Sequence, residues 1–306
     1  MEILQEINEN KDIAIALGFF DGIHIGHKKI ITTLVQKANE KGIKSAIITF
    51  DKNPSNYFNE SETPNLQTYK DREIILESLG VDYLYELDFE KYKDMEASEY
   101  LQNVLVENFK PQLIVVGYNH HFGKDKTGSP ALLQEYSSVY NYDCIVIPEQ
   151  FSSNNEQISS TEIRKKITYG DLNKAKELLG RPFSVRNSVI KGAGIARTLG
   201  YPTANIIWPN SMVKLPYGVY FGYVQVKGKL TPSLISWGTK PTLTNGKTES
   251  LEAHLYDTKE NLYGKIIKIL FIRRLRYEEK FPNIKLLAEQ IKKDYKAFEI
   301  WAKLAK

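Results

Sequence analysis

Short apolar runs alternate with amphipathic segments through the first half of the chain. The apolar runs cover residues 13–17, 45–50, 83–87, 113–117 and 144–148, and helical periodicity marks the segments 27–41, 70–79 and 97–108 between them. Continuous apolar runs of this length predict parallel strands that are buried on both faces by helices. We therefore expect an α/β domain whose ligands bind at the carboxyl ends of the strands.

The pattern changes around Gly180-Arg181-Pro182. Residues 161–180 have helical periodicity, and the Gly and Pro that follow are a helix stop signal. Beyond them, strand-like runs at 184–190, 218–226, 233–236, 252–255 and 265–272 are separated by Gly, Pro and Asn turns without intervening helices. This pattern predicts a small antiparallel β-barrel, closed by an amphipathic helix over 284–305. The sequence thus predicts two domains, residues 1–183 and 184–306.

Composition adds few further constraints. The 306 residues suffice for two cores, and the net charge of +4 comes from scattered lysines and arginines, which argues against a nucleic-acid partner. The single cysteine, Cys144, excludes an internal disulfide. Neither a signal pattern nor an apolar stretch of about 18 residues is present, so we expect no membrane partner and a cytoplasmic location. We expect a monomer or a weak homo-oligomer.

The turn after the first predicted strand carries the first candidate site. Residues 18–27 read GFFDGIHIGH, and the glycines and the acid lie at a strand-to-helix turn, where backbone N–H groups bind polyphosphate: Gly18, Asp21, Gly22 and Gly26. His24 and His27 are three residues apart, so both imidazoles can face the phosphates. Such positioning and charge stabilisation are what adenylyl transfer requires. Histidines that merely cap the helix are the alternative.

A second phosphate-binding element lies at residues 158–164. Hydroxyl groups stand at the start of a predicted helix, and the guanidinium of Arg164 follows one turn later. Together with the helix N-terminus, these groups suit a triphosphate. The residues concerned are Ser159, Ser160, Thr161 and Arg164. A simple helix cap is the alternative explanation for the hydroxyl groups.

The barrel half has its own candidate group. Thr203 and Asn205 are two residues apart on a strand-like segment, so their side chains share one side. Their oxygens suit Mg²⁺ and phosphate. Glu252 alternates with apolar neighbours on another predicted strand and can act as a general base toward a hydroxyl group. A solvated glutamate with no catalytic role is the alternative.

The N-terminal motifs resemble those of the nucleotidyltransferase superfamily. Together with residues 117–123, GYNHHFG, they resemble the FMN adenylyltransferase module of bacterial FAD synthetases, which implies a Rossmann-like fold. The resemblance implies that His24 and His27 contact the ATP phosphates, that residues 159–164 close over them, and that Asn119 lies near the flavin phosphate or a metal. Asn53 stands in a flavin loop where the family usually has His, and Phe19 stands where many members carry Asn.

The C-terminal motifs resemble the riboflavin kinase domain. The matching segments are residues 200–205, 252–255 and 262–264. The resemblance implies that Thr203 and Asn205 bind MgATP and are the metal ligands, that Glu252 is the general base, and that Arg276 borders the flavin site. It also assigns phosphate binding to the loop with Gly192 and Gly194. In that loop Ala196 replaces a common Gly, and on a later strand Ser236 replaces a usual Asn.

These resemblances predict a bifunctional enzyme. The barrel would convert riboflavin and ATP into FMN, and the N-terminal domain would join FMN to AMP from a second ATP, giving FAD and pyrophosphate; both steps should need Mg²⁺. One alternative is an FMN adenylyltransferase whose barrel is catalytically weak and serves as a flavin-binding or regulatory module. Others are a flavin-sensing regulator that binds RNA or protein, and nucleotide transfer to another phosphate, such as phosphopantetheine or nicotinamide mononucleotide.

Overall fold

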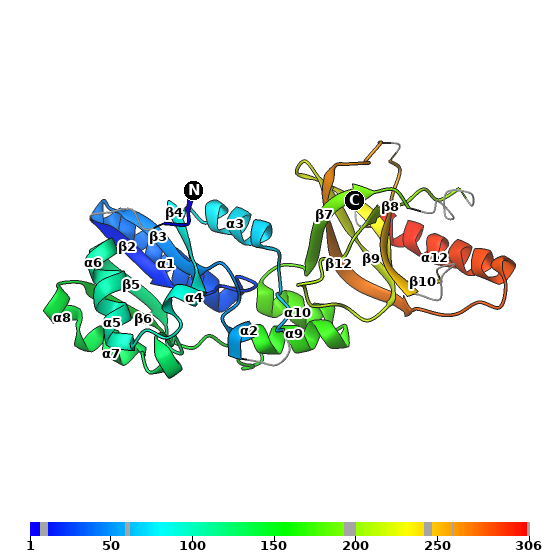
Figure 1. The fold of residues 1–306 in the computed structure, drawn as a ribbon. Helices are drawn as coiled ribbons and strands as arrows, with labels where there is room; N and C mark the ends of the chain where they lie inside the picture. Colours follow the sequence, from blue (N-terminus) through cyan, green and yellow to red (C-terminus); the bar gives the residue numbers. More distant parts are fainter. Residues whose placement is uncertain (7–11, 59–61, 193–199, 242–246, 259, 305–306) are drawn as a thin grey trace. The chain divides into compact units, whose positions relative to one another are not determined.

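The chain folds into two compact units (Figure 1). The computed structural model describes residues 1–306 except 7–11, 59–61, 193–199, 242–246, 259 and 305–306. The first unit comprises residues 1–65 and 69–160, and the second comprises residues 66–68 and 161–306. Residues 161–183 thus pack with the barrel, while the functional boundary at residue 183 stays a prediction. Within the described residues, no helix combines the length and apolar character needed to span a membrane.

The first unit is built on a six-stranded parallel sheet in the order β1-β4-β3-β2-β5-β6. The strands are β1 (Glu2–Leu4), β2 (Ile13–Leu17), β3 (Lys44–Phe50), β4 (Tyr83–Leu87), β5 (Pro111–Gly117) and β6 (Asp143–Ile147). The five predicted strands and the parallel α/β class are confirmed. The edge strand β1 escaped prediction because three residues are too few to show a pattern.

Helices cover both faces of this sheet. Along β2, Ala14 and Ala16 pack against α1 (Ile25–Lys41) and α3 (Tyr69–Ser78), whereas Ile13, Ile15 and Leu17 pack on the opposite face. That second face is covered by a π-helix (Tyr100–Val106), α6 (Glu107–Phe109) and α7 (Pro130–Glu135). The predicted helix over 97–108 is therefore divided into α5 (Ala97–Glu99), the π-helix and α6. Short helices complete the unit: α2 (Ser55–Phe58), α4 (Phe89–Tyr92), a 3₁₀ turn (Lys124–Lys126) and α8 (Ser137–Tyr140).

The strand order places the ligand-binding edge of the first unit. From β2 the chain proceeds to β3 and β4 on one side, and it then returns to β5 on the other side of β2. Ligands of open parallel sheets bind where the order reverses in this way. The loop after β2 and the turn after β5 carry the predicted motifs, and both follow carboxyl ends at this point.

The second unit is a closed antiparallel barrel in the order β10-β11-β8-β7-β12-β9, as predicted. Its strands are β7 (Ser184–Ile190), β8 (Ala204–Ile206), β9 (Gly218–Val226), β10 (Lys229–Pro241), β11 (Lys247–Leu255) and β12 (Ile266–Tyr277). Trp208 and Trp237 pack inside it, with ring centroids 4.5 Å apart. The helix α12 (Ile284–Leu304) covers one side through Phe298 and Ala302, which contact Phe221.

Two helices precede the barrel in the second unit. They are α9 (Ser160–Tyr169), whose first residue belongs to the first unit, and α10 (Leu172–Leu179). Gly180 ends α10 in the left-handed region, with φ of 69°, where a side chain would be strained. The predicted glycine stop signal is thus confirmed.

Candidate functional sites

The β2–α1 loop, residues 18–24, has an unusual backbone. Phe20 and Ile23 have φ of 54° and 35°, and Gly22 has φ of 82°. A positive φ costs free energy for a residue other than glycine. Such a backbone conformation persists only where the surrounding structure holds it in place. Phe20 is 2% exposed and meets the His27 ring edge-on, with centroids 5.3 Å apart. Its burial beneath the loop therefore helps to hold this conformation.

The two predicted histidines lie together at the start of α1. His24 is the N-cap, and its Nδ1 accepts a hydrogen bond from the backbone N–H of His27 at 3.2 Å. In the neutral ring this bond places the proton on Nε2, which is then a hydrogen-bond donor. The imidazoles of His24 and His27 are stacked, with centroids 3.6 Å apart and an interplanar angle of 18°. Capping and ligand binding are thus compatible roles for His24.

Gly26 leaves the space that this histidine stack needs. A Cβ atom at position 26 would lie 3.2 Å from both Cε1 and Nδ1 of His24. That separation is tighter than ordinary van der Waals contact, so a side chain here would displace the His24 ring. The sequence predicted close approach of a ligand to Gly26, and the structure adds close approach of His24.

Ser160, the last residue of the first unit, contacts the β2–α1 loop. Ser160 Oγ donates a hydrogen bond to the carbonyl oxygen of Asp21 at 3.0 Å. Ser159 and Ser160 are half-buried, and Asp21 is 6% exposed. Thr161 and Arg164 lie further along α9, within the second unit. Their contacts with phosphate stay predictions.

The two residues of the first unit that are predicted to contact flavin differ in exposure: Asn53 is buried and Asn119 is exposed. Asn53 is 5% exposed; its Oδ1 accepts from the backbone N–H of Ser55 at 3.1 Å, and its Nδ2 donates to Asn65 Oδ1 at 3.4 Å. Asn53 therefore shapes the loop after β3, and contact with flavin stays a prediction. Asn119 is exposed in the turn after β5, at the ligand-binding edge of the sheet.

Next to Asn119 lie two histidines, His120 and His121. His120 stacks on Phe122 with ring centroids 5.8 Å apart. Burial, with a smaller effect from His121, lowers the pKa of His120 to about 4. The described residues include no cluster of three or more His, Cys, Asp or Glu side chains that could hold a metal. His120 is thus a neutral packing residue at pH 7.

In the barrel, the predicted catalytic side chains meet. Thr203 Oγ1 donates to Glu252 Oε2 at 2.8 Å, and Asn205 Nδ2 lies 3.4 Å from Thr203 Oγ1. Ser250, which the sequence analysis missed, donates its hydroxyl to Glu252 Oε1 at 3.2 Å. Glu252 is directly opposite Asn205 in the β11–β8 pairing, so their side chains share one face of the barrel wall.

Ser236 and Gly192, which the sequence analysis named, lie next to Glu252 and Asn205. Ser236 on β10 is directly opposite Glu252 on β11. A Cβ atom at Gly192 would lie 2.5 Å from the carboxamide of Asn205, so glycine is needed for this close approach. Gly194 and Ala196 lie outside the described residues.

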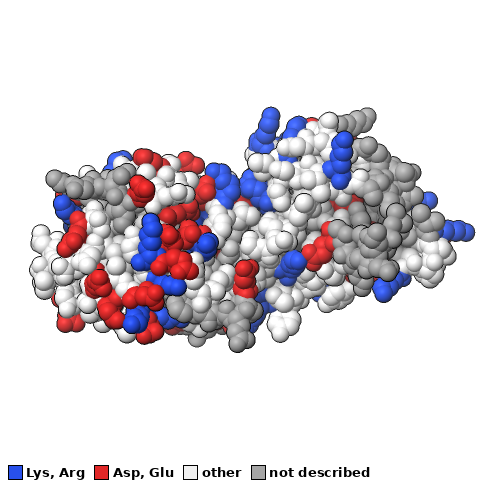
Figure 2. Space-filling model, viewed as in Figure 1, with Lys and Arg blue, Asp and Glu red and all other residues white. Residues whose placement is uncertain are grey.

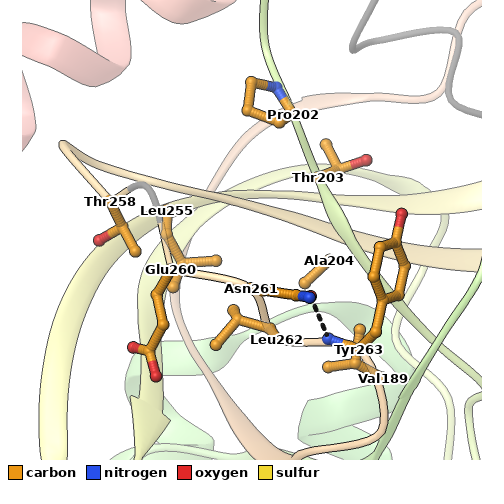
Figure 3. Close-up of a pocket in the computed structure, with 10 residues that line it drawn as sticks. All are labelled: Val189, Pro202, Thr203, Ala204, Leu255, Thr258, Glu260, Asn261, Leu262 and Tyr263. Carbon is orange, nitrogen blue, oxygen red and sulfur yellow. Dashed lines mark hydrogen bonds between the residues drawn. The ribbon is translucent and has the colours of Figure 1, made fainter.

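A pocket of about 450 Å³ opens beside Thr203 (Figure 3). Figure 3 shows the Tyr263 ring extending toward Thr203, and the Tyr263 backbone N–H donates to Asn261 Oδ1 at 3.1 Å. The lining residues are Val189, Pro202, Thr203, Ala204, Leu255, Thr258, Glu260, Asn261, Leu262 and Tyr263. The pocket thus joins two segments whose motifs the sequence analysis singled out, residues 200–205 and 262–264.

Arg276 is held by a partner that sequence patterns did not reveal. Its Nε lies 3.0 Å from both carboxylate oxygens of Asp294 on α12, and its Nη2 donates to Oδ2 at 2.7 Å. Asp294 is 5% exposed and also accepts from Gln290 at 2.8 Å. The carboxylate fixes the Arg276 guanidinium, while a contact with flavin stays a prediction. The residues are 18 positions apart, beyond any local pattern.

A histidine on β11 connects the segment before Thr203 to α12. His254 Nδ1 lies 2.8 Å from the Pro202 carbonyl oxygen, and its Nε2 lies 3.2 Å from the Tyr295 hydroxyl. Burial lowers the pKa of His254, against the opposing effect of the Pro202 carbonyl. The neutral ring therefore donates from Nδ1 and accepts at Nε2, which fixes its orientation.

Comparison with known proteins identifies a family for each of the two parts of the chain. Residues 6–162 match the family model for FAD synthetase, and residues 179–302 match that for riboflavin kinase. The bifunctional riboflavin kinase/FMN adenylyltransferase of Bacillus subtilis is 33% identical over 291 residues, which cover 94% of this chain and 91% of that protein. The protein of the same name from Haemophilus influenzae is 32% identical over 284 residues, with 92% and 91% covered.

A solved structure shares the complete fold. The crystal structure of a macrolide-efflux protein from Streptococcus pneumoniae has a TM-score of 0.85 and 26% identity, and the match covers 98% of this chain and 99% of that one. The likeness therefore includes both the parallel sheet and the barrel. With both family models matched in order and similarity over nearly the full length, this chain belongs to the bifunctional riboflavin kinase/FMN adenylyltransferase family.

Proposed function

We propose that each part of the chain performs one step of flavin cofactor synthesis, with the boundary between the two activities near residue 183. The barrel phosphorylates riboflavin to FMN, and the parallel-sheet domain adenylylates FMN to FAD, with ATP as a substrate of both steps. The observation that carries the kinase assignment is the contact of Thr203 with Glu252 beside the pocket. For the transferase, it is the stacked pair His24 and His27 at the start of α1.

In the kinase step, an oxygen of the riboflavin ribityl chain attacks the γ-phosphorus of ATP, and ADP leaves. Glu252 accepts the proton of the attacking hydroxyl group. Thr203 and Ser250 each donate to one of its carboxylate oxygens, which orients the carboxylate. Arg276, fixed by Asp294, borders the flavin. Gly192 and Gly194 bind the ATP phosphates.

Mg²⁺ is the expected metal of the kinase site. Hard divalent cations of this size bind through oxygen and keep substrate phosphates among their ligands. The Thr203 hydroxyl and the Asn205 carboxamide lie side by side and fit this preference, with most ligands left to ATP and water. When bound, Mg²⁺ neutralises phosphate charge and orients the triphosphate.

In the transferase step, a phosphate oxygen of FMN attacks the α-phosphorus of ATP, and pyrophosphate leaves. His24 and His27 donate to phosphate oxygens at the N-terminus of α1, where the backbone amides also favour anions. Gly18, Asp21, Gly22 and Gly26 shape the loop, and residues 159–161 with Arg164 bind the triphosphate. Asn119 and Asn53 lie toward the FMN side of the site.

Labelled ATP tests both steps in one reaction mixture. With riboflavin as the flavin, a label on the γ-phosphate should enter FMN and remain in FAD, whereas a label on the α-phosphate should enter FAD alone. If γ-label never enters a flavin while added FMN still takes up α-label, the barrel is a flavin-binding module and not a kinase. Failure of both labels to enter any flavin would refute the proposed function.

We also propose that the protein works without nucleic acid and as a monomer or weak homo-oligomer. The charge distribution supports the first part: on the face in Figure 2, carboxylates gather over the first unit and are interspersed with lysines and arginines. Mass measurement by light scattering, with and without added RNA, tests both parts. A stable oligomer or an RNA complex at physiological salt would contradict them.

A further inference from the structure

Arg72 lies on α3, outside every sequence motif discussed so far. It is the only arginine among residues 1–160. It is also 2% exposed, which is rare for a guanidinium unless it has partners. A planar group with five N–H donors can contact several acceptors at once, which a lysine ammonium cannot do with the same geometry.

The guanidinium connects three structural elements of the first unit. Nη1 donates to the carbonyl oxygen of Phe19 at 3.2 Å and lies 3.3 Å from Thr49 Oγ1, and Nη2 donates to Glu86 Oε1 at 2.5 Å. Phe19 lies in the β2–α1 loop, whereas Thr49 and Glu86 are paired neighbours near the carboxyl ends of β3 and β4. Arg72 therefore ties the β2–α1 loop to the strands beside it.

Aromatic side chains strengthen this connection. The Arg72 guanidinium carbon lies 5.2 Å from the Phe19 ring centroid and 4.9 Å from that of Tyr69, both within cation–π range. The two rings meet edge-to-face, with centroids 6.5 Å apart. The ring contact therefore depends on an aromatic side chain at position 19.

The Phe19 carbonyl lies just before the most constrained part of the loop. Phe20 follows with φ of 54°, and its ring packs against His27. A shift of Phe19 would therefore be passed to Phe20 and then to the histidine stack. Thr49, the other acceptor of Nη1, begins the segment 49–54, which contains Asn53. Arg72 thus holds both the ATP-binding loop and the start of the flavin loop.

We propose that Arg72 is a positioning residue for FMN adenylylation. It fixes the β2–α1 loop against the carboxyl end of β3, so that the α-phosphorus of ATP and the phosphate of FMN meet in a reactive geometry. This inference rests on the proposed transferase activity of the first unit. Small displacements are costly in such reactions, since a shift of about 1 Å can reduce the rate about 100-fold.

The test uses the full-length Arg72→Lys variant, which keeps the charge beside Glu86 but loses the planar fork. We expect kcat for FMN adenylylation to fall about 10- to 100-fold, and KM to rise for both ATP and FMN, because both loops lose their anchor. Riboflavin phosphorylation in the same preparation should stay within about twofold of the original. The matched control is Lys37→Gln, which disrupts the exposed ion pair with Glu40 in the same unit.

Thr49 provides a second, milder test. Thr49→Val removes one acceptor of Nη1 at nearly constant volume, whereas Thr49→Ser keeps the hydroxyl. We expect Thr49→Val to raise the KM for ATP and the KM for FMN. Thr49→Ser should leave both KM values unchanged. In the double variant Arg72→Lys/Thr49→Val, the effects should be less than additive, because both changes break the same contact.

The possible outcomes separate the two claims. If the original protein converts FMN to FAD and Arg72→Lys leaves kcat and both KM values unchanged, the positioning role is refuted while the proposed function stands. A lower kcat with unchanged KM values, in proportion to a lower folded fraction, would refute it as well, because that pattern indicates stability alone. An original protein that does not adenylylate FMN would refute both claims.

Discussion

Substitution of Glu252 by Gln isolates the proposed general base of the kinase. The change keeps the size of the side chain, and its amide oxygen can still accept from Thr203, whose hydroxyl lies 2.8 Å from the carboxylate in the structure. What is lost is the group that takes the proton from the attacking hydroxyl. The contact with Ser250 at 3.2 Å shows that both carboxylate oxygens already have donors, so the orientation should persist.

The size of the effect follows from the role. A positioned general base contributes about 10²- to 10⁴-fold in rate, so we expect a loss of that order in kcat. This loss corresponds to a barrier higher by about 3–5 kcal/mol. The KM for riboflavin should change little, because the substituted group acts mainly in the transition state. Riboflavin, ATP and Mg²⁺ are the reactants, and FMN formation is followed by chromatography.

Two controls accompany the Glu252→Gln variant. The first is adenylylation of supplied FMN by the same preparation, which should be unchanged because it occurs at the other site. The second is Glu249→Gln on the same strand, where the carboxylate pairs with Lys214 and Tyr217. That partly exposed pair contributes at most about 1 kcal/mol to stability, and kinase activity should survive its loss. A Glu252→Gln variant that keeps kcat within about threefold would refute the general-base role.

Three further predictions concern other positions. Gly26→Ala brings Cβ to 3.2 Å from the His24 ring, so adenylylation should fall about tenfold with phosphorylation unchanged; equal rates in an FMN-to-FAD assay would contradict this. Gly192→Ala would place Cβ 2.5 Å from the Asn205 carboxamide and displace it, so ATP should bind the kinase more weakly, and an unchanged KM for ATP would count against that site. The pKa of His120 is lowered from 6.5 to about 4, so below pH 6.5 the unfolded chain binds a proton that the folded chain does not. Stability of the first unit should therefore fall between pH 6.5 and 4, by at most about 3 kcal/mol, and His120→Phe should flatten this dependence in urea unfolding; an unchanged slope would refute the assignment.

The sequence predicted those features that depend on local patterns. Buried parallel strands such as β2 are continuous apolar runs, and Gly180 marks a helix end by its backbone freedom. The pairing of Thr203 with Asn205 followed from strand alternation, and the structure places both on one side. The three-residue strand β1 lies below the length at which a pattern is visible.

What the sequence did not reveal depends on contacts between distant segments. The partner of Arg276 is Asp294, which comes from a helix whose charged residues otherwise resemble a solvated surface. Arg72 reaches Phe19 across 53 residues, and its burial has no signature in the pattern around it. In both cases the sequence gives the residue type, but tertiary packing determines the burial and the partners of the side chain.

The central claim is that one chain carries two successive flavin-modifying activities. The most direct measurement is a time course of the purified protein with riboflavin, ATP and Mg²⁺, with the flavins separated by chromatography. The account predicts that FMN accumulates first and then gives way to FAD. Riboflavin that stays unchanged, or FMN that is never converted to FAD, would contradict it.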